Sequence, residues 1–110
     1  MIARLPTHLA VGALLRRVND AGGFAVVRAS GDPQGGAVLA LVEEGGRIHA
    51  VERYIDLDDR ESLVPAGPTD GDSTKVEEYW QRRRARDPDL WVIELTVPEA
   101  ERFIAETILR

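Results

Sequence analysis

Cysteine is absent from the 110-residue chain. This absence excludes a disulfide framework, a thiolate zinc site and a cysteine nucleophile. Long apolar runs are absent as well, because no stretch reaches the length of a signal-peptide core or of a membrane-spanning helix. The sequence therefore predicts a cytoplasmic protein without a membrane segment.

Histidines and aromatic residues are scarce. The two histidines, His8 and His49, have no partner at ligand spacing, so we expect no metal site, no cofactor and no histidine base. Aromatic residues make up 5% of the chain, so the core should consist mainly of Val, Leu, Ile and Ala. Basic residues are outnumbered 14 to 19 by acidic ones. The net charge of -5 argues against nucleic-acid binding, whose affinity comes mainly from neutralised phosphates.

What the chain does contain is enough apolar sequence for one hydrophobic core. Its length and its 44% apolar content predict a single domain over residues 1–110. Apolar residues at helical spacing predict three amphipathic helices, and runs rich in Val, Ile and Leu predict four strands. The helices are expected at residues 7–21, at 74–86 and from Pro98 onward, and the strands at 24–30, 37–42, 47–56 and 90–97.

Two turn-like sequences connect the first three strands. Residues 31–36, GDPQGG, carry Asp, Pro and Gly where β-turns favour them, and they lead into a strand. A hairpin turn is therefore favoured over a phosphate-binding loop, which normally leads into a helix. Gly45 and Gly46 mark a second hairpin turn. In the order α-β-β-β-α-β-α, we predict an α+β fold: an antiparallel four-stranded sheet, made of a three-strand meander and a fourth strand, packed with three amphipathic helices.

Residues 57–73 interrupt this pattern. They contain two prolines, two glycines and several acidic residues, so we expect a flexible acidic loop. Calcium binding is not predicted, because counting from Asp56 puts Glu61 and Gly67 where an EF-hand needs its glycine and its glutamate.

The stretch RRRARDPDLWVIEL, residues 82–95, has two interpretations. In the first, the arginines cover the exposed carbonyls of a helix end, and Asp-Pro-Asp terminates the helix. In the second, Arg83 or Arg84 converges with Asp87 and Trp91 in a cleft that binds an anion or the acidic tail of a partner. The first interpretation is favoured, because polar helix ends are common.

Glu94 lies in the middle of an apolar strand, where a carboxylate must be exposed, paired or perturbed. An arginine partner would account for it, and the candidates are Arg16, Arg17, Arg28 and Arg53. A general acid with a raised pKa is the alternative.

Several motifs together resemble a known family. These are GALLRR at residues 12–17, GFA at 23–25, GDP at 31–33 with GAVL at 36–39, and above all DPDLWVIE at 87–94. They resemble the small bacterial family of domain of unknown function 1491. The resemblance extends over nearly the whole chain except residues 57–73, implies a complete cytoplasmic single-domain protein, and brings no known activity, substrate or cofactor. It points to eight residues: Arg16, Arg17, Asp32, Trp80, Asp87, Asp89, Trp91 and Glu94.

The sequence favours a non-enzymatic binding module for a protein partner or a small anionic ligand. Arginines would supply forked donors, and a partly exposed tryptophan would supply apolar area. A homodimer through the sheet edge or the Trp80 helix is a variant. The alternative is a small enzyme that uses Glu94 or Asp32 with an arginine clamp; this requires a concave pocket. No catalytic residue is assigned, and the candidate binding residues are Arg16, Arg17, Asp32, Trp80, Arg83, Arg84, Asp87, Asp89, Trp91 and Glu94.

Overall fold

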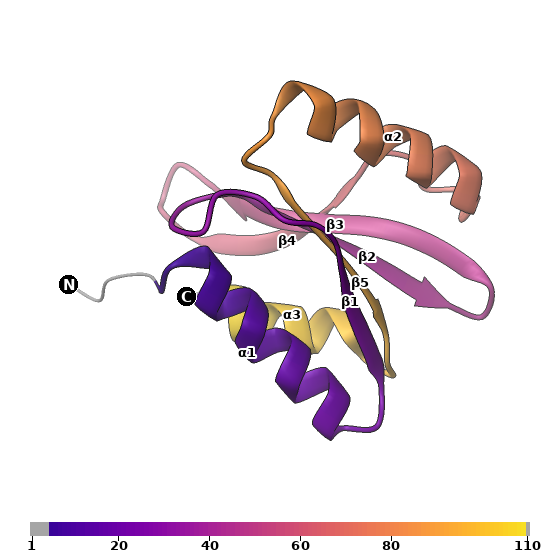
Figure 1. The fold of residues 1–110 in the computed structure, drawn as a ribbon, viewed down its shortest axis with the longest axis horizontal. Coiled ribbons are helices and arrows are strands. Elements are labelled where there is room, and N and C mark those ends of the chain that lie inside the picture. Colours follow the sequence, from indigo (N-terminus) through magenta and orange to yellow (C-terminus); the bar gives the residue numbers. More distant parts are fainter. Residues whose placement is uncertain (1–4, 110) are drawn as a thin grey trace.

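Residues 5–109 form three helices and five strands (Figure 1). The computed structural model describes residues 5–109. The three helices lie close to where the apolar periodicity predicts them. In chain order the elements are α1 (Thr7–Asp20), β1 (Phe24–Ala29), β2 (Val38–Glu44), β3 (Arg47–Ile55), β4 (Glu61–Ala66), α2 (Ser73–Arg86), β5 (Trp91–Thr96) and α3 (Ala100–Ile108).

The sheet is mixed, with the strand order β1-β5-β2-β3-β4. β2 and β5 are parallel, and the other neighbouring pairs are antiparallel. The prediction of an antiparallel four-stranded sheet was therefore wrong. β5 lies between β1 and β2, so residues 31–36 do not join neighbouring strands of a meander. The return of the chain through α2 makes β5 parallel to β2, as a connection that contains a helix allows.

The fifth strand, β4, lies inside the stretch that was predicted to be a loop. Residues 61–66 pair antiparallel with β3, from Ile55 opposite Glu61 to Ala50 opposite Ala66. The sequence conceals this strand because Pro65 argues against a central strand. β4 is instead the outermost strand of the sheet, where a proline is tolerated because its missing N–H need not reach a neighbour.

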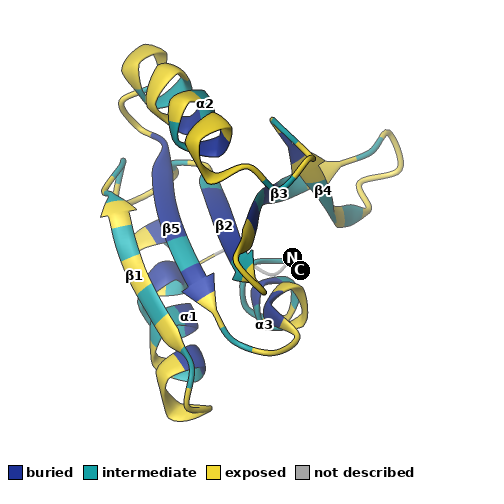
Figure 2. Cartoon of the chain, turned by 90° about the vertical axis from the view of Figure 1, so that its right-hand side faces the viewer, coloured by how far each residue is buried: buried dark blue, intermediate teal, exposed yellow. Residues whose placement is uncertain are grey.

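Helices cover both faces of the sheet (Figures 1 and 2). α1 and α3 pack on one face, and α2 packs on the other, so two hydrophobic cores share one sheet. The apolar run of β2 follows from this arrangement, because its successive side chains point to opposite faces. Ala40 and Val42 join the core under α1 and α3, and Leu39 and Leu41 join the core under α2.

Candidate functional site

Arg83 is held by β3. Its guanidinium donates to both carboxylate oxygens of Glu52, at 2.6 and 2.8 Å, and to the hydroxyl of Tyr79 at 3.1 Å. The hydrogen bonds to Glu52 are the main cause that raises the pKa of Arg83, and they outweigh the opposing effect of burial. The forked donor of this arginine thus faces the sheet and stabilises the docking of α2.

Arg84 connects the end of α2 to two other segments. Its Nε donates to the carbonyl of Leu90 at 3.0 Å, and its Nη2 donates to the carbonyl of Ser30 at 2.6 Å. Asp87 follows the helix, and its carboxylate accepts the backbone N–H of Asp89 at 3.2 Å. The helix therefore ends before Asp87 as predicted, but the carbonyls that Arg84 covers belong to Leu90 and Ser30 and not to the last turn of the helix.

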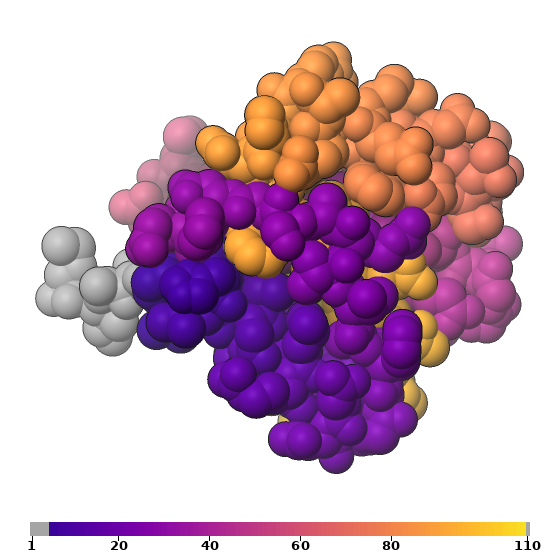
Figure 3. Space-filling model, viewed as in Figure 1, coloured from indigo at the N-terminus to yellow at the C-terminus, as the bar shows by residue number. Residues whose placement is uncertain are grey.

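Asp32, Asp89 and Trp91 form a second group. The backbone N–H of Asp32 donates to the carbonyl of Asp89 at 3.0 Å, and the indole N–H of Trp91 donates to the carbonyl of Asp32 at 2.7 Å. Gly31 and Gly36 permit this close approach, because a β-carbon on either one would collide with the carbonyl of Asp89. In Figure 3 the violet loop after β1 lies directly against α2 and the segment that follows it, in orange.

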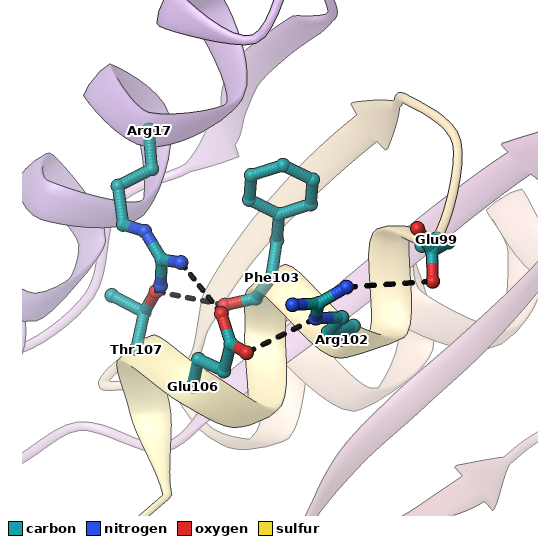
Figure 4. Close-up of polar contacts among 6 residues, drawn as sticks. All are labelled: Arg17, Glu99, Arg102, Phe103, Glu106 and Thr107. Atoms are coloured by element: carbon teal, nitrogen blue, oxygen red, sulfur yellow. Dashed lines mark hydrogen bonds and ion pairs between the residues drawn. The ribbon is translucent and has the colours of Figure 1, made fainter.

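Arg16 and Arg17 lie on α1, on the other side of the sheet from α2. Arg17 donates to Thr107 and to Glu106 on α3, both at 2.6 Å (Figure 4). Its guanidinium also lies 5.4 Å from the centre of the Phe103 ring. These contacts join α1 to α3, whereas Arg16 is exposed. The two arginines of α1 therefore do not share a surface with those of α2.

Trp80 and Glu94 meet at Arg28. The Arg28 guanidinium lies 5.4 Å from the centre of the Trp80 ring and pairs with Glu94 at 2.6 Å and with Glu77 at 2.5 Å. Burial works to lower the pKa of Arg28, but the two carboxylates outweigh it and the pKa is raised. Of the four arginines considered as partners of Glu94, Arg28 is the one it contacts.

Both indoles are buried. Trp80 and Trp91 each retain 8% of their exposure, on opposite faces of the sheet. The indole N–H of Trp91 has its acceptor, whereas that of Trp80 is buried without a hydrogen-bond partner among the described residues. Neither ring lies at the rim of an open surface, and the ten predicted residues fall into separate groups.

Two further surface features had no clear sequence signal. A cavity of about 230 Å³ opens where the start of β3 separates from the end of β4, and Arg47, His49 and Thr69 contribute polar groups to its lining. The Arg47 guanidinium already donates to the carbonyl of Asp70 at 2.5 Å. Neither Glu94 nor Asp32 lines this cavity. Residues 5–109 contain no group of three potential metal-ligating side chains and no helix that could cross a membrane.

The second feature is the outer edge of β1. Within the described part of the chain, β1 pairs only with β5, so its other edge has no partner strand. Phe24 and Val26 lie on the same face as Glu94, and they are exposed by 60% and 36%. Figures 2 and 3 show the strand open to the outside. Alternation in a short apolar strand could have suggested exposed positions, but not that the strand is an edge.

Comparisons with known proteins agree with the fold. The family described as "Protein of unknown function (DUF1491)" matches residues 5–105. The crystal structure of a DUF1491 family protein from Caulobacter crescentus is 29% identical with a TM-score of 0.80, covering 90% of this chain and 94% of that chain. The solution structure of a protein from A. tumefaciens is 30% identical with a TM-score of 0.69, covering 88% and 89%. No curated protein matches the chain.

Proposed function

Because the chain belongs to the family of proteins of unknown function DUF1491, we propose a function from its surface. The protein is a non-enzymatic binding module that takes up an extended segment of a partner protein along the free edge of β1. In this mode the segment becomes an additional strand, whose backbone hydrogen bonds supply affinity and whose alternate side chains supply specificity. One observation carries the proposal: an unpaired strand edge lies beside two exposed apolar side chains, Phe24 and Val26.

The other edge strand of the sheet, β4, supports this choice because its edge, unlike that of β1, is protected. Edge strands present unpaired N–H and C=O groups, and proteins commonly protect them with proline, charged residues or bulges. β4 has Pro65 on its edge. In β1 the charged Arg28 and the register shift between Val27 and Ala29 both lie at the end of the strand, so Phe24 to Val27 form a regular segment without proline, charge or bulge.

The predicted arginine patch has less support as an anion site. Arg17, Arg83 and Arg84 each donate to groups of the protein itself, at 2.6 to 3.1 Å. An anionic ligand would have to displace these partners. The enzyme alternative has less support too. Glu94 has an arginine beside it, Arg28, but the cavity at the start of β3 contains neither Glu94 nor Asp32.

The test is a selection from a displayed library of random peptides, followed by chemical-shift mapping with the best peptide. We expect the largest amide shifts at residues 24–27, and we expect the double variant Phe24→Asp, Val26→Asp to lose binding. Leu9→Asp is the matched control, because Leu9 is an apolar residue that is 49% exposed and lies on α1, not on the edge strand. Peptides that map elsewhere, or that bind the double variant equally well, would contradict the proposal.

Self-association needs its own measurement, because a second copy could supply the added strand. We would follow molecular mass by light scattering over a range of concentrations. A dimer that the double variant abolishes supports binding at this edge, with a second copy as the partner. A dimer that survives in the double variant would contradict association of two copies through the edge of β1.

A further inference from the structure

The turn between β3 and β4 has an unusual concentration of exposed apolar side chains. Tyr54 is 53% exposed, Ile55 is 45% exposed, and Leu57 at the tip is fully exposed, with a relative exposure of 103%. Tyr54 and Ile55 are neighbours in a strand, so their side chains point to opposite faces of the hairpin. Figure 2 shows this hairpin projecting away from the three helices, which leaves both faces bare at the tip.

Asp56 organises the turn that carries Leu57. Its carboxylate accepts the backbone N–H groups of Asp58 at 2.8 Å and Arg60 at 3.0 Å. Its backbone N–H donates to the carbonyl of Arg60, and its carbonyl accepts the N–H of Asp59. Asp59 adopts a left-handed conformation, with φ of 60°, which Asp tolerates better than most residues. The turn is therefore held by its own hydrogen bonds, and Leu57 contributes nothing to holding it.

An exposed leucine on an ordered turn is suited to insertion into another protein. The turn is already in one conformation, so little backbone entropy is lost on binding. A few side chains that fill desolvated pockets near the centre of an interface carry most of its affinity. The strand ends on either side add apolar area from Tyr54 and Ile55.

The charge around Leu57 specifies the partner further. Asp58 and Asp59 are exposed beside it, and Arg60 is the one basic side chain within residues 56–60. Such a tip is complementary to a basic rim and is repelled by an acidic one, including an anionic membrane surface.

We infer that the β3–β4 hairpin tip, residues 54–60, is a docking surface that inserts Leu57 into an apolar pocket rimmed by Lys or Arg on a partner protein. This surface belongs to the opposite edge of the sheet from β1. The inference therefore does not depend on the proposed strand addition.

The experiment places a photo-crosslinking amino acid at position 57 of the full chain in cells of the source organism. Position 9 is the matched control, because Leu9 is also an exposed apolar residue. The crosslinked protein is then identified by mass spectrometry, purified without the crosslink, and its affinity for each variant is measured. A protein crosslinked only from position 57 is expected, and its surface should have a pocket of the stated chemistry.

Leu57→Ala should weaken this affinity about 30-fold, as truncation of a central anchor does. Asp58→Asn with Asp59→Asn should weaken it less and reduce its dependence on salt. Leu9→Ala and the double variant Phe24→Asp, Val26→Asp should leave it unchanged, which separates this inference from the proposed function. The thermal unfolding temperature should not change in Leu57→Ala, because the side chain is fully exposed.

Three outcomes would overturn the inference. One is equal crosslinking from positions 57 and 9. Another is crosslinking from position 57 to lipid, to nucleic acid or to a second copy of the chain. The third is a captured protein whose affinity does not respond to Leu57→Ala.

Discussion

The two faces of the sheet are held to their helices in different ways. Under α1 and α3 the contacts are mainly aliphatic, with Val11, Leu14 and Val18 packing on β2 and β5. α2 buries only Val76 and Trp80, and three arginines supplement them with links to β1, β3 and the loops. Apolar patterning therefore fixes one helix layer, while specific polar pairs orient the other. Four predictions test this difference.

The largest effect is expected on the α1 face. Leu14 is completely buried, so Leu14→Ala removes apolar contacts and leaves a cavity that the sheet cannot easily fill. We expect the free energy of unfolding to fall by about 2–5 kcal/mol, measured by urea denaturation. Leu9→Ala, at an exposed position of the same helix, is the control and should have little effect. A loss as small as that of the control would mean that this core is not closely packed.

On the α2 face, Arg83→Ala should cost less. It leaves the partly buried carboxylate of Glu52 without its forked partner, and we expect a loss of about 1–3 kcal/mol. A double-mutant cycle with Glu52→Gln isolates the pair, because the two effects should not add. Arg82→Ala is the control, since Arg82 is exposed and lies 3.9 Å from Glu78 in the same helix. Additive effects of the two substitutions would contradict the role of this pair.

The two tryptophans give a matched comparison across the sheet. Trp91→Phe removes the hydrogen bond to the carbonyl of Asp32, whereas Trp80→Phe removes an N–H that has no partner among residues 5–109. Both substitutions lose ring area at equal exposure. We expect Trp91→Phe to cost about 1 kcal/mol more, compared in the same denaturation experiment. Equal losses would contradict the expectation that the indole hydrogen bond of Trp91 outweighs the ring contact of Trp80 with the Arg28 guanidinium.

The smallest effect concerns pH on the α3 side. The hydrogen bond from Arg17 is the main cause that lowers the pKa of Glu106 below its usual value of 4.5, and Arg102 adds to it. A carboxyl whose pKa is lower in the folded state stabilises the fold above 4.5, and this contribution is lost as the pH falls through the folded value. Glu106→Gln should therefore be less stable than the native chain at neutral pH, and the difference should shrink as the pH falls below 4.5. A difference independent of pH would contradict this coupling.

The elements that could be predicted are those whose sequence pattern lies within their own residues. All three helices have apolar periodicity and four of the five strands are apolar runs within their own sequence, and they lie close to the predicted residues. β4 could not be found in this way, because Pro65 is acceptable only at an edge and the edge is a property of the whole sheet. The order of strands also escaped prediction, because a turn sequence such as GDPQGG specifies a bend but not which strand lies beside it.

The contacts of the candidate site can also be separated into local contacts and contacts between residues far apart in the chain. The sequence alone determined the helix stop at Asp87 and Pro88, because it depends on residues close together in the chain. Of the two carbonyl contacts of Arg84, the one to Leu90 is local, whereas Ser30 is 54 residues away. Only the tertiary structure decided that Arg83 faces Glu52, that Trp91 donates to Asp32 and that β1 is an open edge. Those pairs are 31 and 59 residues apart, and no local spacing encodes them. Whether a guanidinium or an indole is available to a partner depends on what the folded sheet has already placed against it.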